Sequence, residues 1–103
     1  MSIMGRPRME LQAVLKGIAP NVYFQPPNGL KMVYPCIIYA RDSVDVLYAD
    51  NSPYRHTKKY SVTAIDKNPD SELFEKIAAL PLCKHNRFFT ADDLNHDVFT
   101  LYF

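Results

Sequence analysis

The chain has 103 residues, of which 48% are hydrophobic and 22% are charged. This length and balance are typical of one globular domain spanning residues 1–103, and they exclude a two-domain enzyme. Twelve Lys and Arg residues stand against eleven Asp and Glu residues, which gives a net charge of +1. The charge therefore gives no support to a protein that grips a nucleic acid backbone through a strong positive field.

The two cysteines, Cys36 and Cys83, lie 47 positions apart and form neither a CxxC pair nor a closely spaced disulfide framework. We expect reduced, intracellular thiols, because a cysteine among apolar neighbours is usually a small buried hydrophobe. No apolar run approaches the roughly 18 residues of a membrane span, and residues 1–5 are too short for the apolar core of a signal peptide. We expect the protein to remain in the cytoplasm where it is made.

The N-terminal third predicts a short helix and then a short strand. Apolar residues at the spacing i, i+3, i+4 and i+7 mark one face of the helix: Leu11, Val14, Leu15 and Ile18. The helix is expected to begin near Pro7 and to end by Gly17. Residues 21–25 are β-prone and are cut off by Pro26-Pro27 and by the turn pair Asn28-Gly29, so they predict a short strand.

The middle of the chain predicts two strands joined by a projecting segment. Residues 33–41 carry β-branched and aromatic side chains on both faces, which is typical of a central strand covered on each side, hydrogen-bonded after Pro35. Residues 42–53 are polar and predict a projecting loop or hairpin. Residues 57–66 alternate, and their packed face comprises Tyr60, Val62 and Ala64.

The C-terminal third predicts a second helix and a closing hairpin. Ser71 and Glu72 supply an N-cap and a first-turn acid, and the apolar face that follows predicts about three turns ending at Pro81. Residues 87–91 and 97–103 are β-prone and are separated by a turn. The element order predicts a small single α+β domain, with a mostly antiparallel sheet flanked by two short helices.

The sequence predicts no metal or cofactor site. The histidines, His56, His85 and His96, fall on three separate connections rather than at the spacing of metal ligands. The glycines at positions 5, 17 and 29 are too scattered for a phosphate-binding loop. We therefore expect neither a bound metal nor a nucleotide cofactor.

Two arrangements contain pieces of a catalytic site, and a structural explanation is favoured for each. Cys83 and His85 would point the same way on a strand, but no third group is evident to orient the imidazole. Asp92 and Asp93, with Asp97 nearby, are explained by a turn rather than by acid–base chemistry. We expect no catalytic residues and do not predict an enzyme.

One basic segment, residues 55–59, is flanked by tyrosines. Such a cluster can follow a nucleic acid backbone, but a solvated strand is the more common explanation. If it binds a partner, an acidic patch on a neighbouring copy serves as well as phosphate, because opposite charges suit a head-to-tail ring contact. The residues concerned are Asp42, Asp45 and Asp50 on the acidic side and Tyr54, Arg55, Lys58 and Lys59 on the basic side.

Five strand and turn segments follow one another in a recognisable order. They are VYFQPP at 22–27, YPCIIY at 34–39, YSVTAID at 60–66, PDSE at 69–72 and FTADDLNHDVFTLY at 89–102. Over nearly its whole length the chain resembles the tail terminators of long-tailed bacteriophages, also called tail completion or tail-to-head joining proteins. The resemblance rests on segment order and overall length, since none of these segments carries chemistry.

The resemblance implies an α+β subunit that assembles into a six-fold ring, caps the tail tube, stops its polymerisation and offers a face to the head connector. It implies a virion structural protein, assembled in the host cytoplasm, with genomic DNA passing through the lumen without sequence recognition. The near-neutral net charge fits this expectation, because a strongly cationic lumen would hold DNA back during ejection.

A ring of heterologous contacts needs two different patches on each subunit. We expect one patch within residues 42–59, and the other on the N-terminal helix or on residues 23–28, which include Phe24 and Gln25. The strand at residues 97–103 is a further candidate, as a sheet edge that pairs with a neighbouring subunit's strand.

Two other functions stay open. One is a different neck component, such as a head completion or connector protein, which would bind the portal or adaptor rather than tail tube protein. The other is a small phage-encoded binding module outside the virion, acting on host nucleic acid through residues 55–59, which would show salt-sensitive DNA binding.

Overall fold

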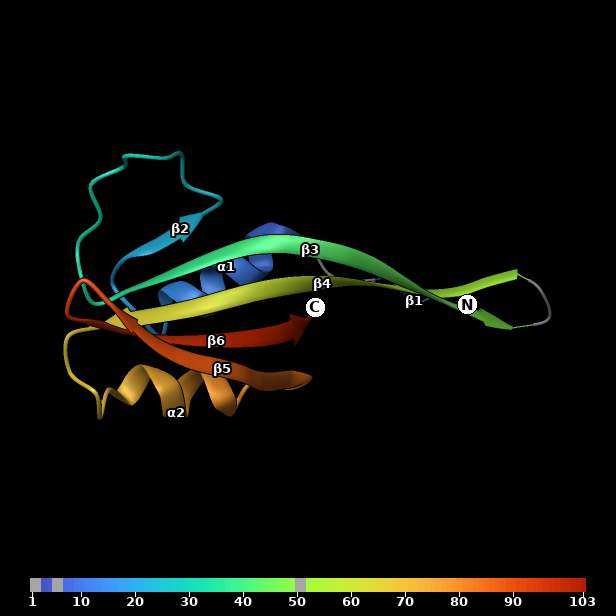
Figure 1. Ribbon diagram of the computed structural model, residues 1–103. Helices are drawn as coiled ribbons and strands as arrows, with labels where there is room; N and C mark the ends of the chain where they lie inside the picture. Colours follow the sequence, from blue (N-terminus) through green and yellow to red (C-terminus); the bar gives the residue numbers. More distant parts are fainter. Residues whose placement is uncertain (1–2, 5–6, 50–51) are drawn as a thin grey trace.

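The computed structural model describes residues 3–4, 7–49 and 52–103, with the side chains of residues 7–42 and 58–103. The elements are β1 Ile3–Met4, α1 Arg8–Lys16, β2 Val22–Phe24, β3 Cys36–Ala49, β4 Ser52–Asp66, α2 Glu72–Ala78, β5 Cys83–Ala91 and β6 Leu94–Tyr102. The strands form one sheet in the order β2-β3-β4-β6-β5, and β1 pairs with β4 (Figure 1). The fold is α+β with a mostly antiparallel sheet, which confirms the predicted class.

The strand order places β6 in the interior of the sheet. The β3–β4, β4–β6 and β5–β6 pairs are antiparallel, whereas β2 lies parallel to β3 and β1 lies parallel to β4. The prediction that residues 97–103 form a sheet edge is therefore wrong. The reason is that the connection through α2 takes the chain to the far edge as β5, and the tight β5–β6 turn then brings β6 back beside β4.

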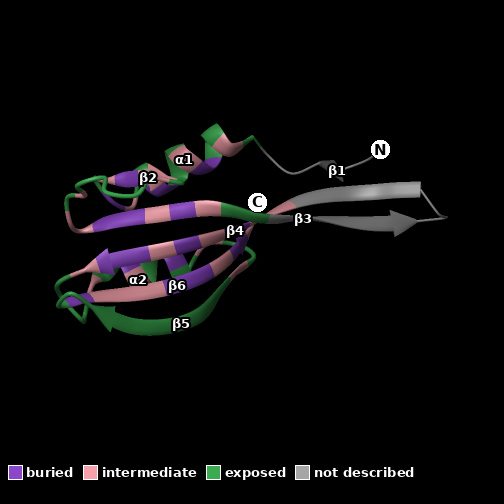
Figure 2. Cartoon of the chain, turned by 45° about the horizontal axis from the view of Figure 1, so that its top comes forward, coloured by how far each residue is buried: buried purple, intermediate pink, exposed green. Residues whose placement is uncertain are grey.

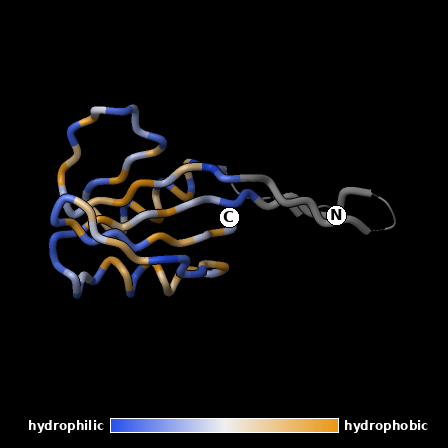
Figure 3. The backbone as a smooth tube through the Cα atoms, viewed as in Figure 1, coloured by the Kyte–Doolittle hydropathy of each residue, from blue (hydrophilic) through white to orange (hydrophobic). Residues whose placement is uncertain are grey.

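Both helices pack on the same face of the sheet. α1 buries Leu11 and Leu15, α2 buries Leu73 and Ile77, and all four side chains belong to one core. The strands contribute Val22, Ile37, Tyr39, Tyr60, Val62, Ala64, Phe99 and Leu101 to that core. The packed face predicted for residues 57–66, with Tyr60, Val62 and Ala64, is confirmed within the described side chains from residue 58 on. Figure 2 shows the buried positions interspersed with half-buried ones along β3, β4 and β6, and Figure 3 shows the matching alternation of hydropathy.

The opposite face of the sheet carries a smaller cluster. Cys36, Ile65 and Leu94 are buried there, and the partly buried Tyr23 and Tyr34 pack against them. The prediction of a central strand covered on each side is thus right for the helix-bearing face of β3, and for the opposite face only at its start. Because both described helices lie on one face, neither of them covers the later positions of β3 on the other face.

Local signals set the bounds of α1 and of the turn after β2. α1 begins directly after Pro7, and the chain leaves the helix at Gly17, as predicted. In the later turn Gly29 has a φ of 82°, and the Leu30 N–H donates to the Pro27 carbonyl at 3.3 Å. This is the geometry of a type II turn, which needs a positive φ at its third residue and therefore favours glycine there.

α2 begins where the sequence predicts but is shorter. The Ser71 hydroxyl oxygen accepts a hydrogen bond from the Leu73 N–H at 3.2 Å, which confirms the predicted N-cap. The helix has seven residues, about two turns rather than the predicted three. After the helix the chain makes one tighter turn, in which the Leu80 N–H donates to the Ile77 carbonyl three residues earlier. The helix does not continue, because Pro81 disfavours helical geometry at the residue before it.

Replacing Ser71 by alanine is expected to lower the free energy of unfolding by about 1 kcal/mol, because the Leu73 N–H loses its acceptor. Ser71→Asp keeps an acceptor at the same position and should leave stability close to that of the wild type. Urea unfolding followed by circular dichroism measures both. Equal losses for the two variants would contradict a capping role.

The β5–β6 hairpin contains a two-residue turn and a β-bulge. Asp92 and Asp93 both have positive φ, at 52° and 62°, between paired Ala91 and Leu94, as a type I′ turn requires. The predicted turn is confirmed but is narrower than residues 92–96, so the strands are longer than expected. Farther along, the register shifts between His85 and Arg87, which leaves one extra residue at position 86.

The β3–β4 hairpin extends beyond the rest of the sheet. β2 pairs with β3 only as far as residue 39, and β6 pairs with β4 only from residue 59. We call the remaining hairpin, residues 42–49 and 52–58, the arm. It points away from both helices (Figure 1), and the fold measures 50 × 25 × 22 Å. The sequence predicted either a loop or a hairpin for residues 42–53, and the structure has a hairpin.

Candidate functional site

The arm gathers most of the residues predicted to form an interface. Asp45 lies on β3 opposite Thr57, and Tyr54 and Arg55 lie on the facing strand β4. The side chains of these residues are outside the described part, and Asp50 lies outside the described residues altogether. The backbone register thus places the acidic and basic segments on the two strands of one hairpin.

At the base of the arm, opposite charges pair within one chain. The Lys59 Nζ lies 3.6 Å from an Asp42 carboxylate oxygen, with side chains 32% and 54% exposed. Asp42 lies in a register shift between Arg41 and Ser43, close to the strand position of Lys59. A surface pair of this kind contributes at most about 1 kcal/mol. Lys58 is half-buried, and its carbonyl accepts from the Phe103 N–H at 2.9 Å. The predicted complementarity is therefore partly met inside the subunit.

Phe24 and Gln25 are held against β3 rather than extended from the surface. The centroid of the Phe24 ring lies 4.9 Å from that of the Tyr39 ring, and the Arg8 guanidinium carbon lies over the Phe24 ring, 4.3 Å from its centroid. The Gln25 side-chain oxygen accepts from the Arg41 N–H at 3.2 Å. These contacts hold Phe24 and Gln25 along the edge of β3. They cover this edge as far as Arg41.

Among the strands whose side chains are all described, β5 is the longest exposed one, and the sequence did not single it out as an interface. Phe88 and Phe89 are 51% and 38% exposed, and Figure 2 shows β5 exposed along its length. The Phe89 ring stacks on His96 at 4.6 Å, and the Arg87 guanidinium lies 5.2 Å from its centroid. Two adjacent aromatic residues in a basic, β-prone segment are the signal that could have marked this surface.

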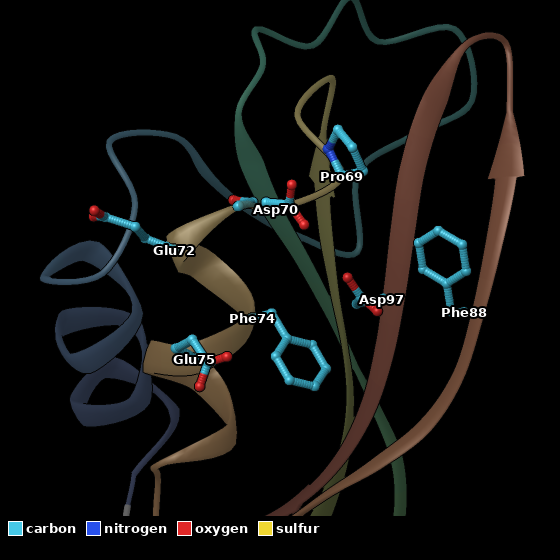
Figure 4. A pocket seen from close by; sticks show the side chains of 8 residues that line it. Pro69, Asp70, Glu72, Phe74, Glu75, Phe88 and Asp97 are labelled. Carbon is cyan, nitrogen blue, oxygen red and sulfur yellow. The ribbon is translucent and has the colours of Figure 1, made fainter.

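A pocket of about 410 Å³ lies where the start of α2 meets β5 and β6. Phe74 from α2 and Phe88 from β5 lie on either side of Asp97 (Figure 4). The rim adds carboxylates from Asp70, Glu72 and Glu75. Negative charge beside aromatic rings suits a cationic group, but most of these carboxylates are exposed and remain hydrated.

His85 has an orienting partner that the sequence did not reveal. Its Nε2 lies 3.2 Å from the Asp97 Oδ1, and its ring makes edge contacts of 5.2 Å with both Phe74 and Phe99. The expectation that no third group orients this imidazole is therefore wrong. His56, His85 and His96 all lie on strands rather than on connections, which corrects their predicted placement.

Burial keeps both thiols protonated. Cys36 and Cys83 are free, and burial raises the pKa of each, that of Cys36 from 9.0 to about 11. A nucleophilic cysteine needs the opposite shift, because the thiolate is the reactive form. The geometry around His85 therefore lacks an activated nucleophile at Cys83. Asp92 and Asp93 occupy the type I′ turn, as the structural explanation for them predicted.

Among the side chains described, residues 7–42 and 58–103, no group of three or more His, Cys, Asp or Glu residues is placed to hold a metal ion. Neither described helix is long and apolar enough to cross a membrane. Comparison of the chain with protein-family models, curated proteins and solved structures gave no match. The described features that bear on function are therefore the α+β fold, the arm and the exposed edge strand β5.

Proposed function

We propose that the chain is a virion structural protein of a long-tailed bacteriophage, a tail terminator that forms a ring at the end of the tail tube. In this role it stops polymerisation of the tube and joins the tail to the head connector. The observation that carries the proposal is the arm, a paired hairpin that leaves the core and, within the described residues, has no strand on the outer side of β3.

An arm of this length suits contact with a neighbouring subunit. The part of β3 in the arm, residues 42–49, spans about 26 Å at the usual strand rise. This reach is comparable with the 25 × 22 Å cross-section of the fold. Within the described chain, the arm is supported beside β4 only by the two-residue strand β1. A hairpin with so little support is marginally stable in water, so a neighbour's surface would add burial that its own subunit does not provide. In a head-to-tail ring, an arm of this length would extend from one subunit onto the next.

The charge distribution supports a ring through which DNA passes without being read. The net charge is +1, and Lys59 is paired with Asp42 rather than left as an isolated cation. A surface with nearly equal numbers of positive and negative charges gains little from counterion release, so it would not retain a passing duplex. The five strand and turn segments that resemble the tail terminators favour this joint over another position in the neck.

The test is polymerisation of purified tail tube protein with and without this chain, followed by negative-stain electron microscopy and light scattering. We expect tubes whose growth stops with a ring of six chains at one end. The control variant replaces residues 45–57 by Asn-Gly, which closes a two-residue hairpin between paired Val44 and Lys58. The variant removes the β4 residues that pair with β1 but none of the buried core, so it should fold and fail to stop tube growth.

Unchanged tube growth in the presence of the wild-type chain would contradict the proposal. Binding to the portal or adaptor ring instead would identify a different neck component. Absence from purified virions, together with a salt-sensitive shift of DNA, would identify the non-virion binding module.

A further inference from the structure

The exposed edge of the sheet at β5 is long and basic. β5 is the last strand in the sheet order, and residues 84–91 are all exposed. Within the described chain no strand lies on its outer side. The strand carries Lys84, His85 and Arg87 and no acidic residue. Such an edge presents unpaired N–H and C=O groups that another strand can bind.

The second long free edge lies on the arm and is acidic. β2 and Gln25 occupy the edge of β3 as far as Arg41. Beyond that point, residues 42–49 pair with β4 on one side, and no described strand lies on the other. This stretch carries Asp42 and Asp45 and no basic residue. The other described edges are shorter: β2 has three residues, and β1, which lies beside β4 in the arm, has two.

We propose that the outer edge of β5 on one copy of the chain pairs with the outer edge of residues 42–49 on the next copy, so that the sheet continues from subunit to subunit. The two edges match in length, at nine and eight residues, and are opposite in charge. They are different parts of the chain, so the contact is heterologous and repeats head to tail. This inference rests on the proposed function and names the contact that builds its ring.

The contact also accounts for the exposed aromatic residues of β5. Phe88 and Phe89 are 51% and 38% exposed on adjacent positions, so they face opposite sides of the sheet. A strand added alongside β5 brings side chains over both faces at once, which covers both rings. Charge opposition then fixes which strand is added, because Lys84 and Arg87 repel a second β5.

Charge reversal on each edge tests the pairing. The β5 variant is Lys84→Glu with Arg87→Glu, and the arm variant is Asp42→Lys with Asp45→Lys. The control is Lys31→Glu with Lys67→Glu, which are exposed positions away from both edges and change the net charge as the β5 variant does. Association is measured by sedimentation velocity and light scattering over a concentration series, with each chain alone and with tail tubes added.

We expect each edge variant to need at least about tenfold higher concentration for half-association than the wild type, because like charges then face each other. The control should associate as the wild type does. Mixing the β5 variant with the arm variant should restore association, because an acidic β5 then meets a basic arm and a native β5 meets a native arm.

Three results would overturn the pairing. The edge variants could associate as readily as the wild type, or the mixture of the two variants could fail to associate. The third is a wild-type chain that stays monomeric both in solution and when tail tubes are added. A β5 variant that forms normal rings but no longer binds tubes would also overturn it, by assigning β5 to the tube protein. The proposed function is judged separately by tube length, so rings that stop tube growth despite reversed edges would refute the pairing alone.

Discussion

Replacing Phe99 by alanine is expected to lower the free energy of unfolding by about 3–5 kcal/mol, because a fully buried aromatic side chain is removed and its cavity closes only in part. Phe99 lies on the interior strand β6, opposite Val62 on β4 and His85 on β5. Its ring also lies 5.5 Å from Phe74, which connects the strand to α2. The loss is a large part of the 5–15 kcal/mol that stabilises a typical domain.

Phe89→Ala is the matched control for this prediction, because it makes the same change on the exposed edge strand of the same hairpin. Its loss should be about 1 kcal/mol or less, since the ring contributes stacking on His96 rather than core burial. Urea unfolding followed by circular dichroism compares the two. Similar losses at positions 89 and 99 would contradict the division of the β5–β6 hairpin into an exposed edge and a buried interior.

Cys36 is expected to react with a small thiol reagent at least about 10³-fold more slowly than Cys83, because a fully buried group in the sheet reacts through global unfolding. Cys36 is 0% exposed and lies under Tyr23 and Tyr34, whereas Cys83 is partly exposed at the start of the edge strand. Timed alkylation followed by mass spectrometry of the two peptides measures the ratio. Equal rates would place Cys36 in a segment that opens locally.

The same burial makes stability fall at alkaline pH. Because the folded pKa of Cys36 is about 11 and its ordinary value is 9.0, the folded state holds the thiol proton more tightly than the unfolded state. This stabilisation is fully present below pH 9 and is lost as pH rises from 9 to 11, on the order of 2 kcal/mol. Cys36→Ala should lose stability at neutral pH but should show a smaller decline between pH 9 and 11. An equal decline in both proteins would assign it to other groups.

Elements that depend on neighbours in the sequence could be predicted. The bounds of α1, the start of β3 after Pro35, the Ser71 cap and the turn at Asn28-Gly29 each follow from a few adjacent residues. The predicted stripe of α1 holds only in part, because Val14 is exposed and Ile18 lies beyond the helix. These signals act within one turn of helix or chain, so a single sequence contains them in full. The α+β class followed from their order.

Arrangements that depend on contact between distant segments could not be predicted. The parallel pairing of β2 with β3 includes a bond from the Ile37 N–H to the Asn21 carbonyl at 2.9 Å, across a loop that gives no local sign of it. The placement of both helices on one face, and of β6 between β4 and β5, are likewise results of packing. The interior position of β6 removed one predicted interface and made β5 an edge.

The candidate surfaces were predictable only in part. The polar composition of residues 42–53 indicated a projection, but not that its two strands stay paired to their ends. The sequence could not predict the His85–Asp97 contact, because it depends on the β-bulge at residue 86. Regular pairing counted back from the Asp92-Asp93 turn would place His85 opposite Thr100, whereas the extra residue places it opposite Phe99, on the helix-bearing face.

The extra residue at Asn86 gives β5 one residue more than its ladder with β6 requires. If Asn86 were absent, Arg87 would still lie opposite Val98 and His85 opposite Phe99, so every cross-strand partner would be kept. Asn86 is thus the one residue in this part of β5 that has no partner position on β6. A related chain that lacked this residue would keep each β5 side chain on its present face of the sheet. Chain length should therefore vary more freely at this position than in the regular parts of the strand on either side.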